Sequence, residues 1–136
     1  MNKQIFRFIL IILCFSVLIC SFYTVASAST TADSYFRSAL TTLTADSKVV
    51  NFVAHTNIAC DAISITSCTL YTQDASGNWV YKTSLPVPST VAYNDFVYLS
   101  TMDYSAYMPN GGTYRIYTVW NADGHSYGRY SNSMSY

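Results

Sequence analysis

The sequence predicts an all-β fold, an antiparallel sandwich of about seven short strands. After residue 34, short runs rich in aromatic and β-branched residues recur, with turn signals between them and no helical periodicity. The clearest two runs flank Asp123-Gly124, a dipeptide typical of tight β-hairpins. Such spacing fits a sandwich or a small barrel, and the length of the chain favours the sandwich.

The N-terminus predicts a secretory signal helix. Lys3 and Arg7 precede an apolar run over residues 8–22, and Ala26 and Ala28 form an A-x-A cleavage site. We expect cleavage after Ala28; the alternative is an uncleaved anchor, because the apolar run approaches the length of a membrane span. The expected organisation is a signal peptide over residues 1–28, a polar lead-in over 29–34 and one domain over 35–136.

The charge of the processed chain argues against a nucleic-acid partner. Five Lys or Arg residues against seven Asp leave a net charge of −2, and the chain contains no Glu. Binding to phosphate backbones needs a basic surface, which this composition does not supply. No second apolar span follows the first, so we expect a secreted, extracellular protein with no membrane contact after cleavage. The signal is typical of a Gram-positive bacterium.

Two cysteines, Cys60 and Cys68, remain after signal cleavage. Because an exported protein meets oxidising conditions, we expect them to form a disulfide that closes a short loop. The alternative is two unpaired thiols, one of them in the core. Their spacing is not C-x-x-C, so a redox-active pair is not expected.

The strands expected before the hairpin differ in how clearly they alternate. In the run over residues 49–55, Val50, Phe52 and Ala54 are expected to face inward. Residues 56–61 are expected to be a loop. Over residues 63–72 the apolar parity changes, which predicts a bulge near Thr66-Ser67. Further strands are expected over 35–43 (with Phe36, Leu40 and Leu43 apolar), 79–83 and 91–100.

A tyrosine near the C-terminus indicates which kind of sandwich this is. Tyr114 begins the penultimate strand, and Ile116 follows two positions later. This pattern matches the tyrosine corner of immunoglobulin-like (Ig-like) sandwiches, in which the hydroxyl satisfies a buried backbone group. The alternative is an ordinary strand tyrosine. The corner favours an Ig-like, fibronectin III-like sandwich.

Four short motifs carry a family resemblance. They are Asp61-Ala-Ile-Ser-Ile, Leu70, Gly77-Asn78-Trp79 and Gly112-Thr113-Tyr114-Arg115. With them, the chain resembles a group of small secreted proteins of Gram-positive bacteria that carry one Ig-like domain and have no known function. The resemblance covers most of the processed chain and implies the fold and the compartment. It implies no activity and no site residues.

The hairpin can form in two registers. A two-residue turn at Asp123-Gly124 would turn Arg129 toward the core, where an unpaired guanidinium is costly. A three-residue loop from Ala122 to Gly124 instead pairs Tyr117 with Arg129 and Val119 with Tyr127 on the outer side. We expect the second register.

That register predicts a binding face on the outside of one sheet, formed by Tyr71, Arg115, Tyr117, Val119, Tyr127 and Arg129. Tyr and Arg bind partners while losing little conformational entropy. The alternative is a ladder of cross-strand contacts that only stabilises the sheet.

No pattern in the sequence indicates catalysis or a cofactor. His55, Asn57, Asp61, Asp123 and His125 could meet at one end of a sandwich, but their spacing is not diagnostic of a metal site, and none is predicted. A glycosidase pair would have to consist of Asp alone, and no nucleophile motif is present. We therefore expect a non-enzymatic domain that binds a protein or glycan at the bacterial cell surface. The alternatives are a bacteriocin-like effector and a structural component of an extracellular layer.

Overall fold

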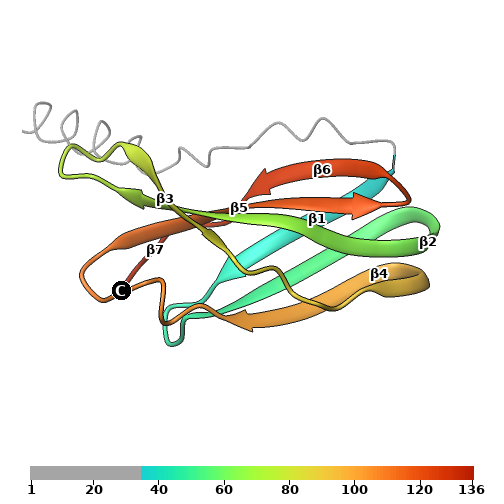
Figure 1. Cartoon of the computed structure of the whole chain (residues 1–136), viewed down its shortest axis with the longest axis horizontal. Helices are drawn as coiled ribbons and strands as arrows, with labels where there is room; N and C mark the ends of the chain where they lie inside the picture. The colour runs from blue at the N-terminus through green and yellow to red at the C-terminus, as the bar shows by residue number, and fades with distance from the viewer. Residues whose placement is uncertain (1–34) are drawn as a thin grey trace, which may run out of the picture. The chain divides into compact units, whose positions relative to one another are not determined.

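The computed structural model describes residues 35–136, which form an antiparallel, curled all-β structure of seven strands (Figure 1). The all-β prediction is therefore confirmed. The predicted signal peptide with its cleavage site at Ala26 and Ala28, and the lead-in over 29–34, lie outside the described residues. The strands are β1 (Phe36–Leu43), β2 (Val49–Gln73), β3 (Trp79–Leu85), β4 (Ala92–Asp103), β5 (Thr113–Ala122), β6 (His125–Tyr130) and β7 (Met134–Ser135).

The long strand β2 organises the fold, because its two halves pair with different neighbours (Figure 1). Residues 50–56 pair with β1, and residues 49–63 pair with β4. Residues 63–72 pair with β5, and residues 68–73 pair with β3. On its other side, β5 pairs with β6 and with the short β7. β2 therefore pairs directly with four of the other six strands.

The prediction of a loop over residues 56–61 is wrong, because β2 continues through this segment. The pairing with β4 is interrupted between His55 and Cys60, which is where the strand bends. A second irregularity lies between Ile65 and Ser67, so the predicted bulge at Thr66-Ser67 is confirmed. The bulge allows both Ile65 and Cys68 to be buried despite their opposite parity.

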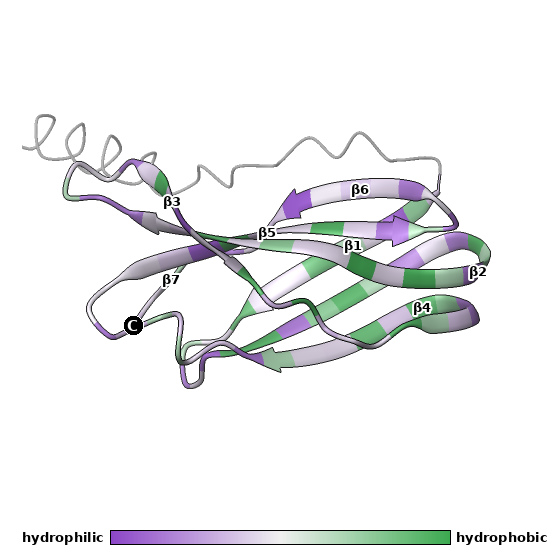
Figure 2. Cartoon of the chain, viewed as in Figure 1, coloured by the Kyte–Doolittle hydropathy of each residue, from purple (hydrophilic) through white to green (hydrophobic). Residues whose placement is uncertain are grey.

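The core fills the space between the two halves of β2. Val50, Phe52 and Ala54 are fully buried, as predicted. Trp120 of β5 packs edge-on against Phe52 and Tyr98, with ring centroids 6.1 and 5.5 Å apart. Figure 2 shows hydrophobic and hydrophilic residues alternating along much of these strands, as expected when one side of each strand faces a core.

The strand predicted over residues 35–43 is present as β1. Of its apolar members, Phe36 and Leu43 are buried, whereas Leu40 is 46% exposed and Ala39 takes the inward position. The register of β1 against β2 shifts between Phe36 and Ser38, which reverses the parity of the residues that follow. Leu40 therefore lies on the outer side of the strand.

The structure does not contain the disulfide expected between Cys60 and Cys68. Both thiols are free and buried. The two residues lie eight positions apart in one strand, and eight extended residues span roughly 25 Å. A disulfide requires Cα atoms within about 7 Å of each other. Burial raises the pKa of the Cys68 thiol to about 11, so this side chain is an uncharged core residue.

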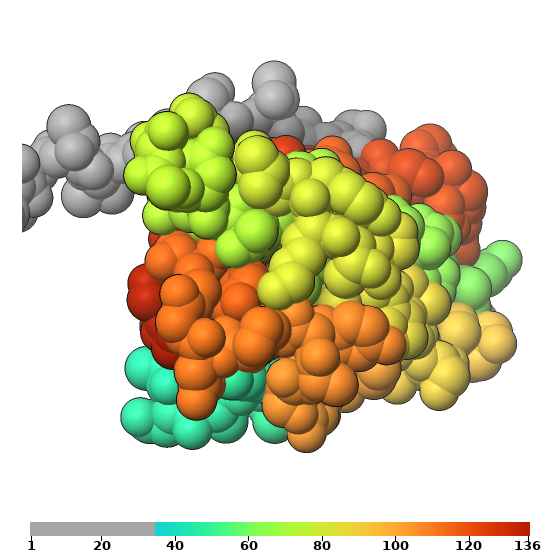
Figure 3. All heavy atoms as spheres, turned by 60° about the vertical axis from the view of Figure 1, so that its left-hand side comes forward, coloured from blue at the N-terminus to red at the C-terminus, as the bar shows by residue number. Residues whose placement is uncertain are grey.

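Three contacts hold the remaining segments in place. The chain from β3 to β4 crosses the side of the molecule shown in Figure 3, where the Tyr104 hydroxyl donates to the Pro86 carbonyl oxygen at 2.6 Å. Inside, the Thr41 and Thr118 hydroxyls share a buried hydrogen bond of 2.7 Å that joins β1 to β5. The Asn132 side-chain amide binds both the N–H and the C=O of Leu43. Residues before and after the long strand are thereby tied together.

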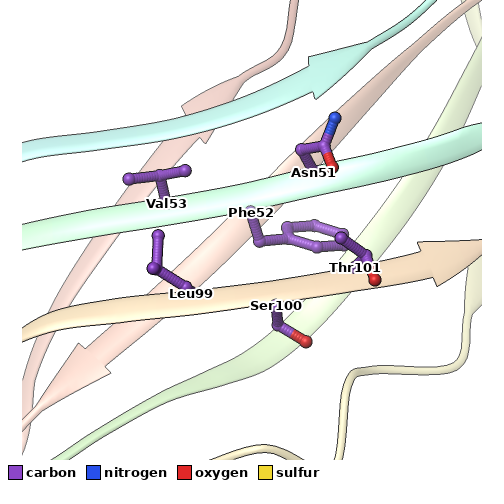
Figure 4. Close-up of a pocket in the computed structure, with 6 residues that line it drawn as sticks. All are labelled: Asn51, Phe52, Val53, Leu99, Ser100 and Thr101. Atoms are coloured by element: carbon purple, nitrogen blue, oxygen red, sulfur yellow. The ribbon is translucent and has the colours of Figure 1, made fainter.

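The outer side of β1, β2 and β4 carries a row of aliphatic side chains. Leu40 pairs with Val53, and Val53 pairs with Leu99, which is 64% exposed. A shallow depression of about 370 Å³ lies between β2 and β4 beside this row (Figure 4). We call Leu40, Val53 and Leu99 the aliphatic row.

Candidate binding face

Four of the six residues predicted for the binding face lie on one side of the sheet. Tyr71 of β2 pairs directly with Arg115 of β5. Tyr117 and Val119 follow at alternate positions along β5, so their side chains point to the same side as Arg115. All four are half-buried rather than enclosed in the core.

The other two predicted residues are placed wrongly by the expected hairpin register. Ala122 pairs with His125, so the turn contains only Asp123 and Gly124. Both have positive φ, 50° and 85°, as a type I′ turn requires. Tyr117 therefore pairs with Tyr130, and Arg129 lies on the opposite side of β6.

The energetic argument against this register does not apply, because Arg129 is half-buried rather than enclosed. It lies on β6, an edge strand, where a long side chain can reach water. Tyr127 has the same inward direction and stacks against Phe36, with ring centroids 5.6 Å apart. Tyr127 and Arg129 are thus excluded from the predicted face.

Three aromatic residues that the sequence analysis did not assign complete the face. Tyr130 enters from β6 through the corrected register, and Trp79 and Tyr81 enter from β3. The signal for the β3 pair was available, because aromatic residues at alternate positions follow the turn at Gly77. We define the aromatic face as Tyr71, Trp79, Tyr81, Arg115, Tyr117 and Tyr130.

The rings of the aromatic face form a continuous set of contacts across four strands. Tyr71 lies between Tyr81 and Tyr130, at centroid distances of 6.4 and 5.6 Å and in edge-to-face geometry. Tyr117 and Tyr130 lie closer, at 4.7 Å. Despite these contacts, Tyr81 is 61% exposed and Tyr130 is 43% exposed. The rings are therefore ordered and also accessible.

Arg115 lies among these rings. Its guanidinium carbon is 4.0 Å from the centroid of the Tyr130 ring and 4.3 Å from that of Trp79. The Tyr71 ring is 5.8 Å away. Within residues 35–136 the buried Nε atom has no hydrogen-bond acceptor. Arg115 is thus oriented by aromatic contacts rather than by a carboxylate.

Two further features keep the face ordered and limit its charge. The Tyr117 ring lies over Gly128, where an added Cβ would be 2.0 Å from the Tyr117 hydroxyl oxygen. The pKa of Tyr71 is raised, first by desolvation and then by its hydrogen bond with Tyr130. The Tyr71 phenol therefore remains neutral near pH 7. Arg115 is the one Lys, Arg, Asp or Glu among the six residues of the aromatic face.

Tyr114 is held at the start of β5 by burial and by one backbone contact. Its side chain is buried, and its hydroxyl donates to the Pro109 carbonyl oxygen at 3.0 Å. The ring lies over Gly112, where a Cβ would be 2.2 Å from the hydroxyl oxygen. Tyr114 therefore fixes the approach to β5, the strand that carries Arg115 and Tyr117.

The polar residues considered for a metal site serve other purposes. The Asp123 carboxylate accepts hydrogen bonds from the backbone N–H groups of Asp61 and Ala62. The His125 ring stacks on Tyr35 at 3.9 Å. No group of three or more His, Cys, Asp or Glu side chains suited to a metal ion is found in the described part of the chain.

In comparisons with known proteins, no family model, curated protein or solved structure matches the chain. Over residues 35–136, no helix is long and apolar enough to cross a membrane.

Proposed function

We propose that this chain is a secreted, non-enzymatic Ig-like domain of the fibronectin III-like kind, and that it binds a protein or glycan at the surface of a Gram-positive cell. The strand pairing supports the fold, since β1 and β4 flank one half of β2, whereas β3 and β5 flank the other. In Ig-like sandwiches the second and third strands likewise belong to different sheets. The Tyr114–Pro109 hydrogen bond is the contact expected of a tyrosine corner.

The observation that carries the binding proposal is the position of Arg115 between the rings of Trp79 and Tyr130, with Tyr81 exposed beside them. Surfaces that bind partners are enriched in Tyr, Trp and Arg, because these side chains offer large contact areas at small entropic cost. In this face the rings are held by their neighbours before any partner arrives. Export is supported by the sequence of residues 1–28.

The test is capture of partners by the processed protein, purified from culture medium, in a pull-down from cell-surface extracts and on a glycan array. We expect Tyr81→Ala to reduce capture by about tenfold or more. The matched control is Tyr93→Ala on β4, because Tyr93 is 69% exposed and lies outside the aromatic face. Equal capture by both variants would exclude this face as the binding surface.

One observation favours a second candidate, a structural component of an extracellular layer. The exposed aliphatic row could bring copies of the chain together. Fractionation of cultures and sedimentation of the purified protein distinguish the two proposals. A monomer that captures partners supports the binding domain, whereas concentration-dependent assembly that Leu99→Asp abolishes supports the layer component. Inhibition of neighbouring strains would instead support a bacteriocin-like effector.

A further inference from the structure

We infer that the ligand of the aromatic face is an acidic glycan, with the Arg115 guanidinium binding an anionic group of the sugar and the tyrosine rings contacting its ring faces. This inference rests on the proposed binding function and specifies the ligand. It is argued from the charge, the orientation and the surroundings of Arg115.

The charge of the face is not neutralised by the protein. The other outward positions of the four strands around it carry no acidic side chain; they include Ser67, Thr69, Gln73, Val119, Ser126 and Gly128. The Asp74 carboxylate, in the turn before β3, accepts hydrogen bonds from the backbone N–H groups of Ser76 and Asn78 rather than from Arg115. The processed chain as a whole has a charge of −2, so a positive face is a local feature. An anionic group on the ligand would complement it.

The orientation of Arg115 suits an oxyanion. The rings of Trp79 and Tyr130 lie 4.3 and 4.0 Å from the guanidinium carbon and restrict the side chain. The Nε atom is buried and has no acceptor within residues 35–136, so a ligand would bind the two terminal Nη groups. A planar guanidinium binds carboxylate, sulfate or phosphate groups through two parallel N–H···O bonds. Because the fork is already held in place, less conformational entropy is lost on binding.

The surroundings favour a sugar over a peptide. The rings of Tyr81 and Tyr130 are exposed at the two sides of the face and present broad amphipathic surfaces. Hydroxyl groups of Tyr81 and Ser84 lie next to each other, 3.4 Å apart, and can exchange hydrogen bonds with sugar hydroxyls. These exposed rings and hydroxyl groups can contact the ring faces and hydroxyl groups of a chain of pyranose units that bear acidic groups.

The experiment is a fluorescence titration of the processed protein with polygalacturonate, neutral dextran and poly-L-glutamate at matched low ionic strength. Trp79 reports on the face, because the other tryptophan, Trp120, is fully buried. We expect polygalacturonate to bind about tenfold or more tightly than either of the others, since dextran lacks the carboxylate and polyglutamate lacks the sugar rings. Binding should weaken as salt is added.

Three variants test the role of Arg115. Arg115→Gln should weaken binding of polygalacturonate by about tenfold or more, and Arg115→Lys should restore only part of it, because lysine lacks the planar fork. The matched control, Arg129→Gln, removes the same charge from the opposite side of β6 and should leave binding unchanged. Unfolding curves of each variant show that the fold is retained, and the comparison of polymers needs no variant at all.

Several outcomes overturn the inference. Equal affinity for polyglutamate would indicate a peptide or general anion site, and equal losses in Arg115→Gln and Arg129→Gln would indicate a diffuse charge effect. A purely structural ladder predicts no binding of polygalacturonate and reduced stability for Arg115→Gln. If Tyr81→Ala abolishes capture of a partner while Arg115→Gln does not, the proposed binding face stands and the acidic ligand is wrong. If neither variant changes capture, both proposals fail.

Discussion

The aromatic face and the aliphatic row are both built on the outer side of β2, and they differ in what their exposed side chains can do. The aromatic face combines rings in contact with one another and an unneutralised Arg115. The aliphatic row consists of Leu40, Val53 and Leu99, which are cross-strand neighbours without a polar group. Leu99 is as exposed as Tyr81, at 64% against 61%. The two surfaces therefore differ in the charge and the order of their side chains rather than in exposure.

The two surfaces also depend differently on the interior. Arg115 and Tyr117 alternate along β5 with Tyr114, Ile116 and Thr118, which are buried. Val53 of the aliphatic row lies on β2 between Phe52 and Ala54, which are buried. One core therefore supports both surfaces, and the hydrogen bond between Thr41 and Thr118 is one contact that links them.

The largest effect is expected from breaking that link. Thr118→Val should lower the free energy of unfolding by about 1–3 kcal/mol, because it leaves the buried Thr41 hydroxyl without a partner. Replacing both threonines with valine should recover most of the loss, since both polar groups are then removed. Urea unfolding of the two single variants and the double variant measures this. Additive losses in the double variant would show that the two hydroxyls are not coupled.

A change of intermediate size in the free energy of unfolding should distinguish the aromatic face from the aliphatic row. Tyr117→Ala should lower the free energy of unfolding by about 1 kcal/mol, because the contact with Tyr130 and the cover over Gly128 are lost. Leu99→Ala should change it by less than about 0.5 kcal/mol.

A double-mutant cycle that combines Gly128→Ala with Tyr117→Ala tests the same packing contact. The added Cβ should be harmful in the wild type, where it meets the Tyr117 hydroxyl, and neutral or favourable in Tyr117→Ala. Thermal unfolding of the four proteins gives the coupling. Equal effects of Gly128→Ala in both backgrounds would contradict the close packing of Tyr117.

The smallest expected effect is on the stability of the fold at low pH. Backbone hydrogen bonds hold the pKa of Asp74 below 3.8, chiefly through the N–H of Asn78, and that of Asp103 likewise through the N–H of Ser105. A lowered pKa means that each carboxylate stabilises the fold above pH 3.8, and that this contribution is lost as the pH falls through the lowered pKa.

Asp74 holds the turn before Trp79, and Asp103 ends β4 on the side of the aliphatic row. Asp74→Asn should reduce the acid dependence of the melting temperature below about pH 4. It should also weaken binding at the aromatic face, whereas Asp103→Asn should affect only the melting temperature. Melting curves between pH 2 and 6 together with binding titrations check both. Equal binding losses in the two variants would contradict this division.

Strict alternation was the most reliable guide in the sequence. It identified Val50, Phe52 and Ala54 as core, and the change of parity after Ile65 located the bulge. Both patterns depend only on which side of a strand is buried. The bend of β2 between His55 and Cys60 had no comparable signal, because this segment contains neither Gly nor Pro. The expected disulfide rested on the export signal and the count of two remaining cysteines, and neither observation shows that Cys60 and Cys68 lie far apart along one strand.

The hairpin register follows from local turn chemistry. The Asp123-Gly124 dipeptide favours a two-residue turn, whereas the three-residue loop was expected because it avoids the cost of burying Arg129. That cost does not arise, because β6 is an edge strand and Arg129 is only half-buried. Tyr71, Arg115, Tyr117 and Val119 lie on the one side of the sheet that parity within their own strands predicts, whereas Tyr130 joins them only through the pairing of β5 with β6. Leu40 lies on the outer side because of a register shift near the start of β1, which cannot be seen in one strand alone.

The contact between Asn132 and Leu43 bears on how the protein behaves at high concentration. β1 pairs on one side with β2, so its other side is an edge at which a strand from another molecule could be added. The amide of Asn132 occupies both backbone groups of Leu43 on that side, with bonds of 2.8 and 2.9 Å. These two backbone groups are therefore not available to pair with a strand from another molecule, which should disfavour polymerisation through the edge of β1. A side chain from beyond β6 thereby protects the solubility of a domain that has little charge to keep its copies apart.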